Sequence, residues 1–342
     1  MPDTLPIPKT KLMPPQAVER VLPRPHLVSR ITRALRTCRL TLLSAPAGSG
    51  KTTLALQAIR QLQKVPVAWL RLSEDENDLQ AFLSAVIAAW DMGLPRGLAL
   101  SKAHFNSIAE KASEAHPLLA SLLNELIATK LPQLVLVLDD YHVIQNEAVH
   151  QALIYLLDHA PPDLHMLITS RVNPPLPIAR LRLINQLTEI HLTDLKFDAQ
   201  EIRTYFQKLW QIELTPAEEA LVCERTDGWV ASLHLLGLTL KQLDDPRQQH
   251  AFLSRFTGSN RLIYQLLAEE VLDHQPHELR MFLLETSILL ELSPQLCRAV
   301  TGNPKAAELL QEAYRRNLFL TALENRAAYR YHDLFADFCN TS

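Results

Sequence analysis

The chain has few glycines, few and scattered cysteines, and no long apolar run. Only 8 of the 342 residues are glycine, and the four cysteines include no Cys-x-x-Cys pair. Such cysteine usage argues against a disulfide framework or a zinc site and favours a reducing compartment. No apolar run reaches about 18 residues, and prolines occupy the N-terminal positions where a signal peptide needs an apolar core. We therefore expect a cytoplasmic protein that does not enter a membrane.

An excess of charge of either sign is also absent. The formal net charge is −3, which lacks the basic balance of a protein that wraps nucleic acid. No short-period repeat and no low-complexity segment is present. With 47% hydrophobic and 21% charged residues, the chain can bury an ordinary core. Its length suggests about two or three domains.

Two of the few glycines fall in the stretch Ala45–Thr53, which reads Ala-Pro-Ala-Gly-Ser-Gly-Lys-Thr-Thr. An apolar run at residues 40–43 precedes this stretch, and a helical run at residues 54–62 follows it. Strand, glycine-containing loop and helix are the context of a phosphate-binding loop. The backbone N–H groups of such a loop and the N-terminus of its helix form a cradle for phosphate. Ala45 replaces the first glycine of the usual pattern, at a position that asks mainly for a small residue.

The loop pattern assigns a role to each residue that follows. Lys51 is expected to reach the β- and γ-phosphates, Thr52 to place its hydroxyl on Mg²⁺, and Thr53 to lie near the α-phosphate. The alternative is a Gly-Ser turn before a helix with a chance Lys-Thr pair. The nucleotide-binding residues predicted here are Ala47, Gly48, Ser49, Gly50, Lys51, Thr52 and Thr53.

Charged residues follow two further apolar runs. Residues 134–138 lead into Asp139 and Asp140, and residues 164–169 lead into Ser170 and Arg171. Asp139 is expected to hold Mg²⁺ opposite Thr52, its alternative being a turn or cap aspartate. Asp140 either orients or deprotonates an attacking water or merely caps the next turn. Arg171 can sense the γ-phosphate, unless it is simply an exposed arginine. Lys51, Asp139, Asp140 and Arg171 form the predicted catalytic set.

The order of the elements predicts the fold. Apolar runs at residues 40–43, 66–72, 134–138, 164–169 and 189–192 alternate with helical patterns, as in a doubly wound α/β domain whose site lies at the C-terminal ends of the strands. A strand at residues 66–72 is expected to lie between the phosphate loop and Asp139, which suggests an additional-strand ATPase. After Phe197 the patterns become helical. Two helices and an alternating pair of strands at residues 318–323 and 328–332 then suggest a winged helix.

The predicted fold is an AAA-like α/β P-loop NTPase of the additional-strand type, followed by an all-α helical domain and a winged-helix domain. Residues 1–26 hold seven of the 22 prolines and are expected to form an extended arm. The nucleotide-binding domain is predicted at residues 27–197, the helical domain at 198–290 and the winged helix at 291–342. Residues 294–342 carry six Lys/Arg and five Asp/Glu, a net of 6 − 5 = +1. That balance is too small for a face that binds nucleic-acid phosphates.

Five motifs together resemble a known family. They are Ala45–Thr53, Leu138-Asp139-Asp140-Tyr141-His142, Ser170-Arg171 followed by prolines, Asp227-Gly228-Trp229, and Tyr331-His332-Asp333-Leu334-Phe335. Their order resembles that of the STAND class of signal-transduction NTPases, and within it the maltose-regulon activator family, the large ATP-binding regulators of the LuxR family. The resemblance covers roughly residues 20–340.

The resemblance implies a nucleotide-operated switch. ADP would hold a closed, inactive form, and an inducer with ATP would open it into a form that self-associates. Carried over by position, Val28 and Arg30 would line the adenine, and Asp139 would serve Mg²⁺. His332 matches a winged-helix histidine that touches the ADP β-phosphate, although Tyr331 replaces the usual Met before it. Taken alone, His332, Gly228 and Trp229 are packing residues.

Longer members of this family add a helical-repeat sensor and a C-terminal helix-turn-helix that binds DNA, and neither is visible here. We expect a truncated or a shorter homologue that binds ATP, ADP and Mg²⁺, responds to an unknown inducer, and hydrolyses ATP slowly for regulation. Two other classes stay open: a turnover ATPase of the AAA-like motor or antiviral type, and a scaffold that binds ADP and never hydrolyses ATP.

Overall fold

The computed structural model describes residues 7–16, 21–94, 115–130, 133–243, 245–254, 268–323, 328–331, 335–336 and 338–339. The chain divides into two compact units. Unit 1 comprises residues 1–19, 23–44 and 51–191, and unit 2 comprises residues 20–22, 45–50 and 192–342. The first half of the phosphate loop, Ala45–Gly50, therefore clusters with the second unit. The four domain boundaries expected above remain predictions.

Unit 1 is built on a parallel five-stranded sheet in the order β2-β3-β4-β1-β5. All four strand pairs are parallel. Every residue of β1, β3 and β4 is buried, as in a sheet covered on both faces. The strands are β1 Leu40–Ser44, β2 Val67–Arg71, β3 Leu134–Asp139, β4 Leu164–Ser170 and β5 Leu187–His191.

The additional-strand fold is confirmed, but the expected position of residues 66–72 is wrong. The strand between β1 and β3 is β4, whereas β2 lies at the edge of the sheet. Burial gives the physical reason. All seven residues of β4 are buried, so β4 fits a position with a neighbour on each side. In β2, Val67 is half-buried and Arg71 is exposed, as an edge strand allows.

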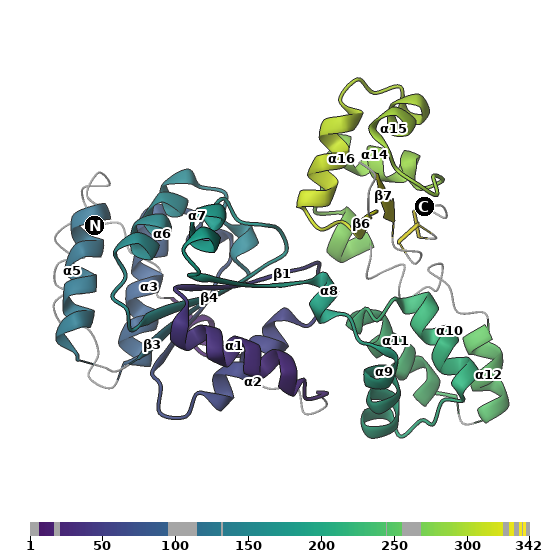
Figure 1. Ribbon diagram of the computed structural model, residues 1–342, viewed down its shortest axis with the longest axis horizontal. Coiled ribbons are helices and arrows are strands. Elements are labelled where there is room, and N and C mark those ends of the chain that lie inside the picture. The colour runs from purple at the N-terminus through teal and green to yellow at the C-terminus, as the bar shows by residue number, and fades with distance from the viewer. Residues whose placement is uncertain are drawn as a thin grey trace. The chain divides into compact units, whose positions relative to one another are not determined.

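Helices cover both faces of this sheet (Figure 1). On one face lie α1 Pro25–Thr37, which begins with a proline in its first turn, and α2 Lys51–Gln61. The other face carries α3 Leu79–Gly93, α5 Ala115–Ala128 and α6 Glu147–His159, and α7 Ile178–Leu183 packs next to β5. Three short 3₁₀ turns complete the described part of the unit: η1 Lys9–Lys11, η2 Glu74–Asn77 and η3 Tyr141–Val143.

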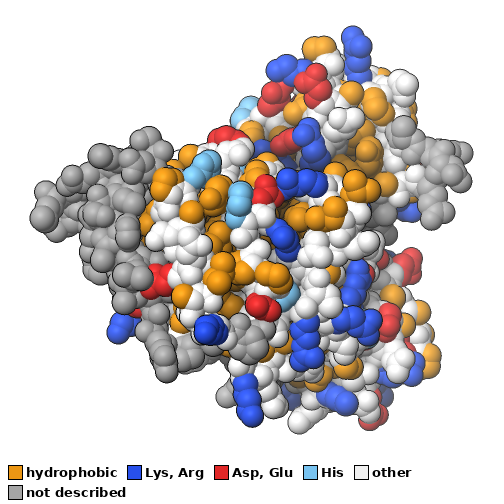
Figure 2. All heavy atoms as spheres, turned by 60° about the vertical axis from the view of Figure 1, so that its left-hand side comes forward, with side chains coloured by type: hydrophobic (Ala, Val, Ile, Leu, Met, Phe, Trp, Pro, Cys, Tyr) orange, Lys and Arg blue, Asp and Glu red, His pale blue; other side chains and the backbone are white. Residues whose placement is uncertain are grey.

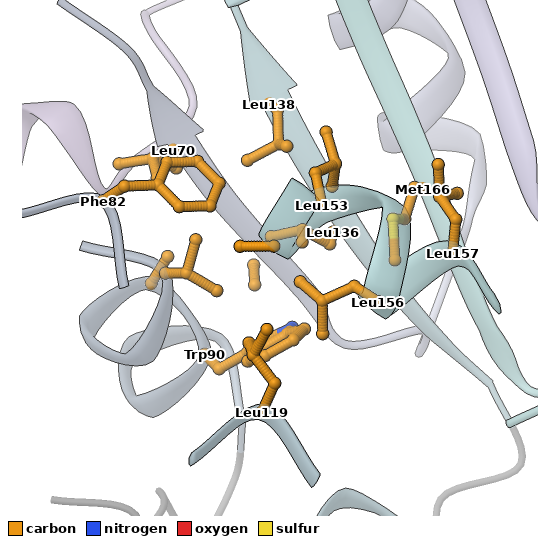
Figure 3. Close-up of a cluster of buried hydrophobic side chains, with 14 of the residues drawn as sticks. Leu70, Phe82, Trp90, Leu119, Leu136, Leu138, Leu153, Leu156, Leu157 and Met166 are labelled. Carbon is orange, nitrogen blue, oxygen red and sulfur yellow. The ribbon is translucent and has the colours of Figure 1, made fainter. Parts of the chain in front are cut away.

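The strand register aligns the apolar side chains of one sheet face. Leu136 lies opposite Met166, which lies opposite Leu40, and Leu70, Leu138 and Ile168 form the next row. The row residues pack with side chains of α3, α5 and α6, as Figure 3 shows for Phe82, Trp90, Leu119 and Leu156. Each large side chain buried this way contributes about 1.5–3 kcal/mol. This core fixes the strand ends, where the charged residues follow.

Unit 2 is mainly helical and ends in a short antiparallel hairpin. The predicted order of two helices before a strand pair, typical of a winged helix, is confirmed. The helices are α8 Leu192–Leu195, α9 Ala199–Tyr205, α10 Pro216–Thr226, α11 Val230–Lys241, α12 Pro246–Ser254, α14 His277–Thr286, α15 Pro294–Thr301 and α16 Ala306–Arg315, with π-helical turns at Phe206–Trp210 and Ala268–Leu272. The hairpin strands are β6 Leu320–Ala322 and β7 Tyr329–Tyr331.

The surface carries mixed charge. The face drawn in Figure 2 carries both basic and acidic side chains, and several of the basic ones lie near one another in its lower part. The same mixture follows from the near-neutral composition of the chain.

Candidate nucleotide-binding site

Lys51 is the first residue of α2 and is almost fully buried, with 7% of its surface exposed. Burial lowers the pKa of its ammonium group to about 8, because a charge loses its hydration inside the protein. The carboxylates of Asp140 and Asp139 oppose this shift, and the charge of Arg171 adds to it. These three charges therefore all act on the Lys51 ammonium group within unit 1.

The Asp139 carboxylate lies at the end of β3 and accepts two hydroxyl hydrogen bonds at one oxygen. Thr52 Oγ1 donates to Asp139 Oδ1 at 2.8 Å, and Thr169 Oγ1 donates to the same atom at 2.6 Å. Asp139 is 1% exposed, and burial raises the pKa of its carboxyl group, while the two hydroxyl bonds lower it. Two strand ends and the start of α2 thus converge on one buried carboxylate.

The donor set fits Mg²⁺. Mg²⁺ prefers oxygen ligands in an octahedron with bonds of about 2.0–2.1 Å, which places two adjacent ligands about 2.9 Å apart. Thr52 Oγ1 and Asp139 Oδ1 lie 2.8 Å apart. Among the described residues, no cluster of three or more His, Cys, Asp or Glu side chains could hold a metal ion alone. Thr52 and Asp139 offer two oxygen ligands, and phosphate oxygens and water would complete the octahedron of a cation bound there.

Asp140 has a different environment from its neighbour. Its backbone is left-handed, with φ at +63°, and its N–H donates to Thr169 Oγ1 at 3.0 Å. Its carboxylate forms an ion pair with Arg71 Nε at 3.4 Å. Thr169 therefore connects both aspartates, through the side chain of Asp139 and the backbone of Asp140.

The phosphate loop has the backbone that its glycines permit. Gly48 has φ at +68° and Gly50 has φ at +82°, a region that other residues rarely adopt. Ser49 is 3% exposed, and its hydroxyl has no hydrogen-bond partner. A buried hydroxyl without a partner costs free energy, so a ligand oxygen at the loop would satisfy it. This observation fits a phosphate held by the loop.

The turn Asp227-Gly228-Trp229 lies against the same loop within unit 2. Asp227 and Gly228 both have positive φ, at +46° and +70°. A Cβ on Gly228 would lie 2.2 Å from the Phe197 carbonyl oxygen, so this position requires glycine. The turn starts α11 and brings the Trp229 indole to the loop, where Nε1 donates to the Ala47 carbonyl oxygen at 3.1 Å.

The other predicted site residues lie at several places. Val28 is buried on the inner face of α1, whereas Arg30 is exposed and donates to the Glu189 carbonyl oxygen at 2.7 Å. Arg30 lines a pocket of about 740 Å³ between α1 and β5. Thr53 is half-buried in the first turn of α2, and Arg171 is half-buried after β4. His332 lies outside the described residues, so its role stays a prediction.

Two residues of this region, Thr169 and Arg71, were not among the predicted site residues, because the sequence showed them only as parts of strands. Trp229 was noticed only as part of the Asp227-Gly228-Trp229 motif, with no partner assigned to it. The hydrogen bonds of Thr169 and Trp229 go to residues distant in the sequence, which no local pattern reveals. The separations are 30 residues for Thr169 with Asp139 and 182 for Trp229 with Ala47.

Among the described residues, no helix is long and apolar enough to cross a bilayer. A solved structure, a Walker-type ATPase of Pyrococcus abyssi, superposes with a TM-score of 0.62 at 15% identity, over 96% of this chain and 98% of that one. At this identity the likeness shows the fold alone.

Sequence comparisons match both parts of the chain. Residues 21–169 match the AAA ATPase domain, and residues 268–342 match the MalT winged helix domain. The chain is 33% identical, over 331 residues and 96% of its length, to the HTH-type transcriptional regulators MalT of Yersinia pestis and of Serratia proteamaculans. It spans 36% of the length of those regulators. The two matched domains and this identity support a MalT-like NTPase module, in which a match to the AAA ATPase domain precedes a match to the MalT winged helix domain.

Proposed function

We propose that this chain is an ATP- and ADP-binding switch, the NTPase module of a transcriptional regulator of the STAND class and the LuxR family. ADP holds a closed form, and an inducer together with ATP opens it into a form that self-associates. The observation that carries the proposal is the hydrogen bond between Thr52 and the buried Asp139, beside the buried charge of Lys51. A buried ammonium group needs negative charge nearby, and a bound phosphate would add to that of Asp139 and Asp140.

Each residue of the site has a defined part in nucleotide binding. The N–H groups of the loop Ala47–Gly50 and the hydroxyl of Ser49 bind phosphate oxygens, and Lys51 neutralises the β- and γ-phosphates. Thr52 and Asp139 hold Mg²⁺, which supplies charge neutralisation between the phosphates when bound. Thr53 lies near the α-phosphate. Val28 and Arg30 line the adenine, and Arg171 senses the γ-phosphate.

Slow hydrolysis agrees with the surroundings of Asp140. A general base must have its carboxylate available to a water molecule. The Asp140 carboxylate lies 3.4 Å from the Arg71 guanidinium, which competes for it. We therefore assign the module a slow regulatory ATPase activity. The competing function, a turnover ATPase of motor or antiviral type, shares the same fold and differs by its rate.

The longer regulators that this chain resembles are named as transcriptional regulators of the helix-turn-helix type. By analogy, we propose that DNA is bound through a domain outside this sequence, and that an inducer acts on the whole regulator. Residues 294–342 of the winged-helix segment, with their net of +1, are themselves a poor DNA-binding surface.

Nucleotide extraction tests the proposal. The purified chain should carry ADP, and millimolar ADP should raise its melting temperature, since a ligand at 100 times its Kd adds about 2.7 kcal/mol to the free energy of unfolding. Lys51→Ala should abolish both effects while the protein stays folded. Absence of adenine nucleotide, together with no thermal shift in the parent protein, would contradict the proposed function.

A further inference from the structure

Residues at the start of α11 donate hydrogen bonds to two successive carbonyl groups of the phosphate loop. The Trp229 indole Nε1 donates to the Ala47 carbonyl oxygen at 3.1 Å. Two residues on, the backbone N–H of Ala231 donates to the Gly48 carbonyl oxygen at 3.1 Å. All four residues belong to unit 2. The contacts therefore lie within one compact unit.

Peptide geometry turns these two bonds into an orientation of the loop. In a trans peptide group, the carbonyl oxygen and the N–H of the next residue point in opposite directions. When the carbonyls of Ala47 and Gly48 point to α11, the N–H groups of Gly48 and Ser49 point away from it. Successive N–H groups that face one side form an anion-binding concavity. The contacts with α11 thus set the donors that a phosphate requires.

The packing around Gly48 is close enough to make this orientation specific. A Cβ on Gly48 would lie 2.5 Å from Cβ of Ala231 and 3.3 Å from the Trp229 ring. Trp229 itself is 2% exposed, so its indole has no room to turn away from the loop. Two separate features therefore require glycine at position 48: the positive φ, and the close contact with α11.

Trp229 also contacts the winged-helix segment. Its ring meets Phe319 edge to face, with centroids 5.1 Å apart and planes at 80°. Phe319 stacks on Phe335 at 5.3 Å. Phe319 has φ at +56°, a strained value for an aromatic residue, so its neighbours must hold it there. The indole thus contacts the phosphate loop with its N–H group and the residue before β6 with its ring.

We propose that Trp229 is the positioning residue of the phosphate loop, which holds the loop N–H groups toward the phosphates and links them through Phe319 to the winged helix. This inference rests on the proposed nucleotide binding. It assigns the coupling between nucleotide and winged helix to an indole group on the helical segment. The Asp227-Gly228-Trp229 motif then has a function beyond packing.

The test compares two tryptophans of the same unit. Trp229→Phe removes the indole N–H and keeps a ring against Phe319. Trp210→Phe is the matched control, because Trp210 is also buried and packs on α11, at Gly237. Release of a fluorescent ADP analogue is measured for both variants, beside the melting temperature without nucleotide. Loss of one hydrogen bond predicts release about three- to tenfold faster for Trp229→Phe. Trp210→Phe should release ADP within about twofold of the parent rate.

A second measurement uses the unmodified protein, so that its result does not depend on whether a variant folds. Hydrogen exchange should show that ADP protects the loop at residues 45–50 and the start of α11 together.

A third measurement tests the contact with Phe319. Phe319→Leu should also speed ADP release, and in the double variant its effect on the release rate should be less than additive with that of Trp229→Phe.

The outcomes separate this inference from the proposed function. If the parent binds no ADP, both fail. If the parent binds ADP but Trp229→Phe releases it at the parent rate, or if ADP protects the loop without the start of α11, then Trp229 is a packing residue only. Additive effects of the two substitutions would remove the link to Phe319.

Discussion

The hydroxyl of Thr52 lies 2.8 Å from the carboxylate of Asp139, although 87 residues separate them in the chain. The contact joins the first turn of α2 to the end of β3, with β4 between β3 and β1. This distance is close to the spacing of two adjacent oxygen ligands of Mg²⁺. Five predictions depend on the charges and hydrogen bonds around this pair.

Replacement of Asp139 by Asn tests the magnesium site. Asp139→Asn keeps an oxygen for Thr52 but removes the charge that we propose to hold Mg²⁺. We expect ADP binding without Mg²⁺ to stay near the parent affinity, and Mg²⁺-dependent ATP hydrolysis to fall at least about tenfold. Titration of Mg²⁺ against hydrolysis rate provides the measurement. Hydrolysis at the parent rate would exclude Asp139 as a metal ligand.

The same variant makes a prediction for stability. Burial raises the pKa of Asp139 in the folded state, so the folded protein binds more protons than the unfolded chain between the two pKa values. The charged carboxylate therefore opposes folding at neutral pH, and this penalty disappears as pH falls through the folded pKa. Without nucleotide and Mg²⁺, Asp139→Asn should melt above the parent at pH 7, and the difference should shrink in acid. A lower melting temperature at pH 7 would contradict the buried-charge account.

Lys51 predicts how nucleotide affinity depends on pH. Its pKa is lowered to about 8, and a bound phosphate favours the charged form and raises the pKa again. Nucleotide binding should therefore take up protons above pH 8, and affinity should fall as pH rises through that value. Titration calorimetry at pH 7 and 8.5, in buffers of different ionisation enthalpy, measures the uptake. Binding without proton uptake at pH 8.5 would show that Lys51 does not meet the phosphates.

Thr169 is expected to hold both aspartates in place. Thr169→Val removes one hydroxyl that donates to Asp139 and accepts from the Asp140 N–H. Since it leaves buried groups without partners, the variant should lose about 1–3 kcal/mol of stability and weaken Mg²⁺-dependent hydrolysis. Thr41→Val is the control, because the Thr41 hydroxyl in β1 is buried without a partner. That control should be neutral or stabilising. Equal effects of the two variants in chemical unfolding would argue against the network.

Arg71 is expected to restrain Asp140. An exposed ion pair contributes up to about 1 kcal/mol, which corresponds to about fivefold in rate. Arg71→Gln should therefore raise slow ATP hydrolysis up to about fivefold and leave the melting temperature nearly unchanged. Arg182→Gln, which breaks the exposed pair with Glu189, is the matched control. An unchanged rate in Arg71→Gln would assign Asp140 to capping of the turn rather than to water orientation.

Sequence patterns identify those features of this molecule that residues close together in the chain determine, such as individual strands and the phosphate loop. Buried strands read as apolar runs, and the loop of Gly48 and Gly50 reads as a phosphate cradle because few sequences place such residues between a strand and a helix. The order of the strands in the sheet, in contrast, depends on contacts between residues that are far apart in the sequence. The chain order suggested a central place for residues 66–72, and only the burial of all seven residues of β4 explains why β4 lies there instead.

The hydrogen bonds of the site could not be predicted from the sequence either, because their partners are distant in the chain. Thr169 ends an apolar run and Trp229 follows the turn residues Asp227 and Gly228, and the hydrogen bonds of both depend on partners that the fold brings to them. Arg71 could have been found only from the register, which pairs it with Asp139 across β2 and β3. A sequence-based assignment therefore finds residues with chemistry of their own more readily than residues that position others.

The number of ATP molecules hydrolysed per chain tests the central claim most directly. A known amount of nucleotide-free protein is mixed with excess ATP and Mg²⁺, and the ADP formed is counted over time. A switch that ADP closes predicts a burst of about one ADP per chain, which stays bound, followed by a much slower phase. Continued turnover at many ATP per chain each minute, or no ADP at all, would contradict it.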